Sequence, residues 1–147
     1  MSSRALAITL KIPDNEAFTA LRALQRLHIP VAAVERAEVW IFESSLSDEA
    51  LVEGVRANET LFNPNKHELR VLRDERPRDG EVWIGEQGED PASRAKLGGK
   101  PLAGVTAVRR YTAWLLSGEE GAALPRDQVD LAARGLLCNP AIEKAIL

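Results

Sequence analysis

The chain has 147 residues, 19 Lys and Arg against 22 Asp and Glu, and a net charge of −3. A hydrophobic fraction of 45% can build a core, so the length predicts one ordinary domain or two small ones and excludes a disordered tail. The slightly acidic balance argues against a nucleic-acid binder, and the single cysteine, Cys138, excludes an internal disulfide framework. No apolar run reaches the ~20 residues that span a membrane and no signal peptide is recognisable, which predicts a cytoplasmic protein.

The first half of the chain predicts strands and helices in alternation. In chain order we expect a strand at Ala5–Ile12, a helix at Glu16–His28, a long strand or hairpin at Val31–Ser44, a helix after Ser47, and a closing strand at Glu68–Leu72. Asp14 is placed to cap the first helix, and Pro30 ends it. Ser47 is placed in the same way before the second helix.

The second half predicts the same order after a polar connector that ends at Gly80. We expect a strand at Glu81–Gln87, a short helix at Ala92–Leu97, a long β region at Gly104–Ser117, a helix with Pro125 in its first turn, and a last strand at Ala141–Leu147. The pair Gly98-Gly99 shortens the first of these helices.

An internal repeat relates the two halves. Val31–Phe42 aligns with Val105–Leu116 at an offset of 74 residues, with five identities in twelve positions. Two of these identities are Arg36 with Arg110 and Trp40 with Trp114; at an offset of 76, Asn63-Pro64 matches Asn139-Pro140 and Asp14 matches Asp90. The repeat predicts an α+β fold of two fused βαββαβ-type units, 1–73 and 81–147 with a linker at 74–80, in which antiparallel sheets pack with helices in one compact pseudo-twofold domain.

The residue types that usually carry catalysis show no recognisable spacing. His28 and His67 lack a nucleophile or carboxylate partner in the sequence, and Cys138 stands at a helix end rather than at a helix N-terminus. The Gly99-Lys100 pair lacks the flanking residues of a phosphate-binding loop, and the acidic residues Glu86, Glu89 and Asp90 are typical of a solvated turn. The sequence therefore predicts no catalytic centre, no metal and no cofactor.

The second half resembles PurS, the small subunit of phosphoribosylformylglycinamidine synthase. The resemblance rests on Asp90-Pro91 before a helix, on Gly104–Leu116, and above all on Asn139-Pro140-Ala141-Ile142-Glu143. It implies a non-catalytic subunit of de novo purine biosynthesis, of a family whose dimers bridge the glutaminase PurQ and the synthetase PurL and support ammonia transfer. A chain with two such units resembles a covalent PurS dimer.

Seven residues are candidates for contact with such partners. They are Arg36, Trp40, Arg110, Trp114, Asp90, Asn63 and Asn139. Trp and Arg are enriched at binding hot spots, while the alternative interpretation is core packing for the tryptophans and surface charge for the arginines. The sequence also leaves open a homodimer, an enzyme in its own right, and a tandem ACT-like sensor that binds a small molecule at the loops Pro13–Asn15 and Gly88–Pro91.

Overall fold

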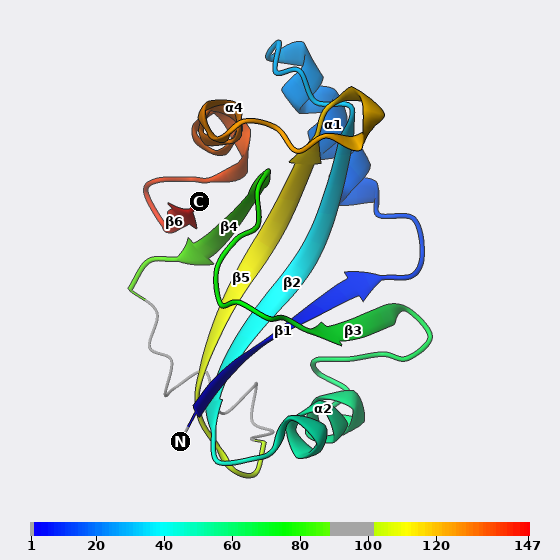
Figure 1. Cartoon of the computed structure of the whole chain (residues 1–147), viewed down its shortest axis with the longest axis vertical. Coiled ribbons are helices and arrows are strands. Elements are labelled where there is room, and N and C mark those ends of the chain that lie inside the picture. The colour runs from blue at the N-terminus through cyan, green and yellow to red at the C-terminus, as the bar shows by residue number, and fades with distance from the viewer. Residues whose placement is uncertain (1, 89–101) are drawn as a thin grey trace. The chain divides into compact units, whose positions relative to one another are not determined.

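The computed structural model describes residues 2–88 and 102–147 and has the predicted α+β class. Its strands are β1 (Ser2–Leu10), β2 (Ala33–Ser44), β3 (His67–Val71), β4 (Glu81–Glu86), β5 (Val105–Ser117) and β6 (Glu143–Ile146). Its α-helices are α1 (Asn15–Arg26), α2 (Asp48–Ala57) and α4 (Arg126–Ala132), and a π-helical turn, η3 (Ala133–Leu137), follows α4. The six strands form an antiparallel sheet in the order β3-β1-β2-β5-β4-β6 (Figure 1).

The predicted βαββαβ order is wrong by one strand in the first half, which runs β1-α1-β2-α2-β3. The long segment after α1 forms the single strand β2, because its sequence from Ala33 to Ser44 contains no Gly or Pro that could turn the chain into a hairpin. The predicted short helix at Ala92–Leu97 lies outside the described residues.

Several predicted boundaries need correction. The first strand begins earlier than expected, at Ser2, because pairing with β2 extends over polar residues that periodicity alone excludes. The last strand is only Glu143–Ile146, because a turn at Asn139 holds the preceding residues. Pro125 is the residue before α4 rather than part of its first turn.

The predicted helix caps at Asp14 and Ser47 are confirmed. The Asp14 side chain accepts hydrogen bonds from the backbone N–H groups of Glu16 and Ala17, each at 3.1 Å. The Ser47 hydroxyl accepts from the N–H of Ala50 at 3.2 Å. Both caps satisfy donors that a helix start leaves free, which explains why α1 and α2 begin where they do.

The chain divides into two compact units, and each takes segments from both halves of the sequence. The first unit contains the described residues of Met1–Ile12, Glu38–Glu75 and Gly88–Arg110. The second contains Pro13–Ala37, Arg76–Gln87 and Tyr111–Leu147. The strands β2 and β5 each contribute residues to both units, so each unit has its own β2–β5 pairing. The predicted boundaries 1–73, 74–80 and 81–147 stay a sequence prediction.

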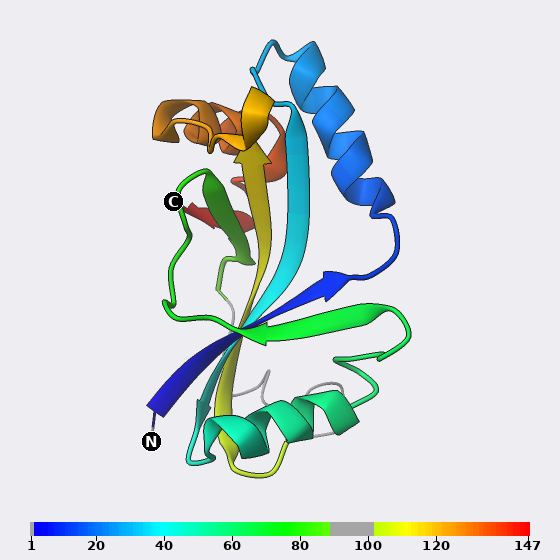
Figure 2. The same ribbon diagram turned by 45° about the vertical axis from the view of Figure 1, so that its right-hand side comes forward.

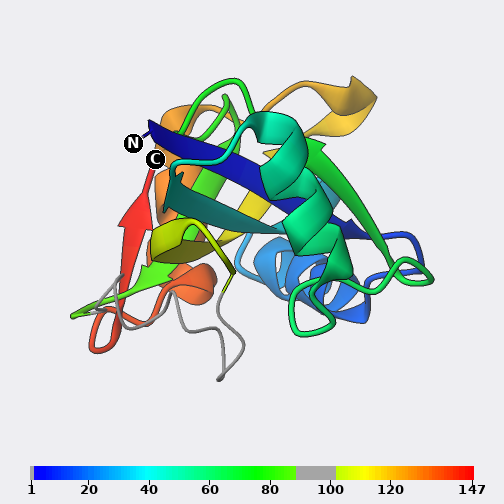
Figure 3. The ribbon, with the colours of Figure 1, turned by 90° about the horizontal axis from the view of Figure 1, so that it is seen from below.

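In the first unit, α2 covers one face of β1 and β2 (Figures 2 and 3). Leu51 and Val55 of α2 are buried against Leu6 of β1 and Phe42 of β2. The other buried members of this core are Ile8, Trp40, Leu61, Phe62 and Val108. Val108 comes from β5, so this core includes a side chain from the second half of the sequence.

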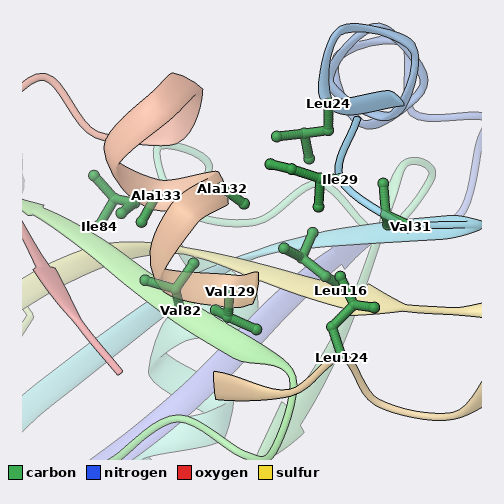
Figure 4. Close-up of a cluster of buried hydrophobic side chains, with 10 residues drawn as sticks. All are labelled: Leu24, Ile29, Val31, Val82, Ile84, Leu116, Leu124, Val129, Ala132 and Ala133. Atoms are coloured by element: carbon green, nitrogen blue, oxygen red, sulfur yellow. The ribbon is translucent and has the colours of Figure 1, made fainter. Parts of the chain in front are cut away.

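The second unit packs α1 and α4 over β4 and β5 (Figure 4). Its buried side chains are Leu24, Ile29, Val31, Val82, Ile84, Leu116, Leu124, Val129, Ala132 and Ala133. Leu24 of α1 and Val31 before β2 come from the first half of the sequence, whereas β4, β5 and α4 come from the second. The core of this unit therefore also combines both halves.

Among the described residues, no helix is long and apolar enough to cross a membrane.

Candidate partner-contact site

In the second unit, the predicted contact residue Arg36 forms a forked ion pair with the cap of α1. Its Nε lies 3.0 Å from Oδ2 of Asp14, and its Nη2 lies 3.1 Å from Oδ1. Its Nη1 donates to Oε2 of Glu16 at 2.6 Å. Only 21% of the Arg36 side chain is exposed, so these contacts hold the guanidinium against the protein.

Asp14 therefore has two structural tasks, since it caps α1 and also binds Arg36. Partial burial acts to raise the pKa of Asp14, but hydrogen bonds from Arg36 and from the N–H groups of Ala17 and Glu16 outweigh it. The net effect holds the pKa of this carboxyl below its ordinary value of 3.8. Asp14 remains ionised wherever the protein works near neutral pH.

The same guanidinium lies over the indole of Trp114 in the second unit. Its Cζ is 6.0 Å from the ring centroid, which is within cation–π range. Trp114 is half-buried and packs against the core of this unit. Arg36 thus connects the start of α1 to β5.

In the first unit, Arg110 and Trp40 repeat this stacking. The Cζ of Arg110 lies 5.6 Å from the Trp40 ring centroid, and its Nη2 donates to Oε1 of Glu38 at 2.8 Å. Trp40 is only 8% exposed, whereas 39% of the Arg110 side chain is exposed. A partner that docks here would therefore meet Arg110 and Glu38 rather than Trp40.

Two buried hydrogen-bond donors in the stack of Arg110 on Trp40 have no hydrogen-bond partner among the described residues. They are Nε of Arg110 and Nε1 of Trp40. In the second unit the corresponding Nε, that of Arg36, is bound by Asp14. Asp90, which aligns with Asp14 in the repeat, lies outside the described residues.

The predicted contact residues Asn63 and Asn139 each organise a turn before a closing strand. The side chain of Asn63 accepts from the N–H of Asn65 at 2.9 Å, and that of Asn139 accepts from the N–H of Ala141 at 3.1 Å. The N–H of Asn63 donates to Nδ1 of His67 at 2.9 Å. In the matching position, the N–H of Asn139 donates to Oε1 of Glu143 at 2.8 Å.

Each asparagine carbonyl also accepts hydrogen bonds from the N–H groups three and four residues later. The two Asn-Pro turns therefore share one hydrogen-bond pattern, and both side chains have a structural task. His67 takes part in the first turn as an acceptor, which gives one of the two histidines a structural role.

The other residues that could carry chemistry are dispersed. Burial, assisted by the nearby carboxylate of Glu143, raises the pKa of the Cys138 thiol, so it is a weak nucleophile at neutral pH. No group of three or more His, Cys, Asp or Glu side chains within residues 2–88 and 102–147 could hold a metal ion.

Sequence reasoning missed Glu38 as a member of this site. Glu38 binds Arg110, which is 72 residues away in the chain, and that contact depends on the pairing of β2 with β5. The signal available in the sequence was the repeat itself, which placed Arg36 and Arg110 in equivalent positions but did not pair the strands.

No protein-family model matches this chain, and no curated protein sequence matches it.

Proposed function

We propose that the chain is a tandem-duplicated, PurS-like assembly subunit of phosphoribosylformylglycinamidine synthase. In this role it would bridge a PurQ-type glutaminase and a PurL-type synthetase and support ammonia transfer between them. Two observations support the proposal. The second half resembles PurS in sequence, and both halves of the chain contribute to each unit of the fold.

The order of the strands supports a duplicated chain. In the first unit the order is β3-β1-β2-β5, and in the second it is β6-β4-β5-β2. The counterparts in the two halves are β1 and β4, β2 and β5, and β3 and β6. When each strand is replaced by its counterpart, the first order becomes the second. A tandem duplication would produce this equivalence of strand orders, which is why it supports the proposed duplication.

The Arg–Trp pairs carry the proposal. Arg36 of the first half stacks on Trp114 of the second, and Arg110 of the second half stacks on Trp40 of the first. The repeat relates the two pairs, so one contact is made twice by residues that duplication would have copied. The shared hydrogen-bond pattern of the turns at Asn63 and Asn139 agrees with this interpretation.

Co-purification tests the proposal directly. The chain is mixed with PurL and PurQ of the same organism, glutamine and ADP-Mg, and the mass of the complex is measured by size exclusion with light scattering. We expect a ternary complex that does not form when the chain is left out. If PurL and PurQ show no change in mass in its presence, the proposal is wrong.

The Arg110→Ala variant tests whether the chain contacts PurL or PurQ through Arg110. Because Arg110 is half-exposed at the candidate site, we expect its removal to weaken the complex about tenfold, as for a hot-spot arginine. Arg109→Ala is the matched control, because Arg109 neighbours it on β5 and pairs with Glu43 at 3.7 Å instead. Equal loss in both variants would contradict a specific role for Arg110.

A further inference from the structure

Among the strands that the structure describes, β3 of the first unit pairs on one side only. It is the first strand of the sheet order and its described partner is β1 (Figure 1). Its last residue, the apolar Val71, is 42% exposed. An edge strand that presents backbone groups and an apolar side chain can accept another strand.

The hydrogen bonds that frame β3 show which of its backbone groups face outward. The N–H of Lys11 donates to the carbonyl of Lys66, and the N–H of Leu72 donates to the carbonyl of Ala5. Along an antiparallel strand, the backbone N–H and C=O groups of successive residues point to opposite sides. Since Lys66 and Leu72 bond to the β1 side, the even-numbered residues of β3 also point their backbone groups toward β1. Leu69 and Val71 therefore point theirs away from the sheet, as does the carbonyl of His67.

The strand β3 carries two side chains of opposite charge, two residues apart. Glu68 and Arg70 are both exposed and share one face of the strand, and neither has an ion-pair partner among the described residues. Leu69 lies on the opposite face, where it packs against the core of this unit.

We infer that β3 is the docking site for a second copy of this chain. Two β3 strands pair antiparallel about Leu69, so that each Leu69 exchanges backbone hydrogen bonds with the Leu69 of the other copy. This register places Glu68 opposite Arg70 of the second copy and Arg70 opposite its Glu68. It also places each Val71 beside a His67 of the second copy, which covers the exposed apolar side chain.

The charges of Glu68 and Arg70 favour this register over its neighbours and favour β3 over β6 as the docking strand. A pairing centred on Glu68 places Glu68 opposite itself, and one centred on Arg70 places Arg70 opposite itself; like charges directly opposite are destabilising. The other edge strand, β6, is less complementary, because a pairing centred on the outward-facing Ala145 places Lys144 opposite the apolar Ile146. The inference rests on β3 alone and does not depend on the proposed function.

Charge exchange tests the interface with the isolated full-length chain. Dissociation constants are measured by sedimentation equilibrium at low and high salt. We expect the wild-type chain to reach twice its mass of 16.1 kDa with rising concentration, and salt to weaken this association. Glu68→Arg and Arg70→Glu, each alone, should raise the dissociation constant about tenfold or more, because both cross-strand pairs then oppose like charges.

The two single variants also test each other. A mixture of Glu68→Arg and Arg70→Glu chains opposes unlike charges again, so we expect it to form a heterodimer about as well as the wild type forms a dimer. Lys144→Glu on β6 is the matched control and should leave the association unchanged. Val71→Pro removes an outward N–H without removing a bond to β1, and it should give a folded monomer, with folding checked by circular dichroism.

A monomeric wild-type chain at every concentration would overturn the inference. An association that the charge variants and Val71→Pro leave intact would also overturn it, as would open-ended assemblies larger than a dimer. None of these results involves PurL or PurQ, so they cannot be confused with failure of the proposed function.

Discussion

At the scale of single residues, Asp14 combines a local and a long-range contact. It caps α1 through Glu16 and Ala17, and it holds Arg36 by two hydrogen bonds to the guanidinium. The first contact follows from the sequence around Asp14, and the second depends on where β2 passes α1. Substitutions that keep the helix cap but remove the charge can measure how much each contact contributes to the free energy of unfolding.

Asp14→Asn keeps a good cap but loses the charged partner of Arg36. We expect it to lower the free energy of unfolding by about 1 kcal/mol at neutral pH, since the ion pair is partly buried. Asp14→Ala loses the cap as well and should cost about 1 kcal/mol more. Urea unfolding of the three proteins measures both differences, and equal stability of Asp14→Asn and the wild type would contradict a stabilising pair.

The pH dependence of this pair has a definite sign. Because the pKa of Asp14 is lower in the folded chain than its ordinary 3.8, ionised Asp14 stabilises the fold above that value. This stabilisation is lost as the pH falls through the lower, folded-state pKa. The stability gap between wild type and Asp14→Asn should therefore be constant above pH 3.8 and shrink below it. A gap that widens on acidification would contradict this assignment.

Glu81 is a buried carboxylate with three hydrogen bonds, and it is only 7% exposed. Its Oε1 accepts from Nε1 of the buried Trp83 at 3.0 Å, and its Oε2 accepts from Nη2 of Arg78 at 3.1 Å. Glu81→Gln can still accept from Trp83, so we expect a loss of about 1 kcal/mol in the free energy of unfolding. Glu81→Leu strands the indole N–H and should cost about 2–3 kcal/mol.

Urea unfolding of the two Glu81 variants compares these losses. If Glu81→Leu proves as stable as Glu81→Gln, then Glu81 does not stabilise the fold through the Trp83 indole.

At the scale of elements, Gly80 fixes the turn that enters β4. Its φ is +78°, and an added Cβ would lie 2.7 Å from the carbonyl oxygen of Leu116 and 3.0 Å from Cβ of Ala123. Gly121 has the same φ, but a Cβ there would meet nothing within 4 Å. The two glycines therefore separate the cost of the left-handed conformation from the cost of the clash.

We expect Gly121→Ala to lower the free energy of unfolding by about 1 kcal/mol, which is the cost of a positive φ alone. Gly80→Ala adds a clash with backbone and should cost about 3 kcal/mol. At this chain length, thermal unfolding should show shifts of about 3 °C per kcal/mol. Equal shifts for the two variants would mean that the turn before β4 relaxes around the new methyl group.

The local devices of these elements could be predicted from the sequence, whereas the pairings between distant strands could not. Asp14 and Ser47 mark the starts of α1 and α2 because each cap bonds only to N–H groups two or three residues away. The stacking partners of Arg36 and Arg110, Trp114 and Trp40, depend instead on the register between β2 and β5, which distant segments of the chain set together. The repeat identified Arg36 and Arg110 as equivalent residues but did not determine their contacts.

At the scale of the whole molecule, the repeated half is not the unit of packing. Val108 of the second half completes the core that contains Trp40, and Val31 of the first half completes the core that contains Leu116. Each core therefore contains buried side chains from both halves of the sequence. We therefore expect residues 1–73 expressed alone to lack cooperative thermal unfolding, and two-state unfolding of that fragment would contradict this interdependence.

Reconstituted enzyme activity tests the proposed assembly role most directly. PurL and PurQ of the same organism are assayed for synthetase activity with glutamine or with ammonia as the nitrogen source, with and without this chain. We expect the chain to raise the glutamine-dependent rate and to leave the ammonia-dependent rate unchanged, because a bridging subunit acts on the transfer of ammonia rather than on the synthetase reaction. A glutamine-dependent rate that is the same with and without the chain would contradict the proposed role.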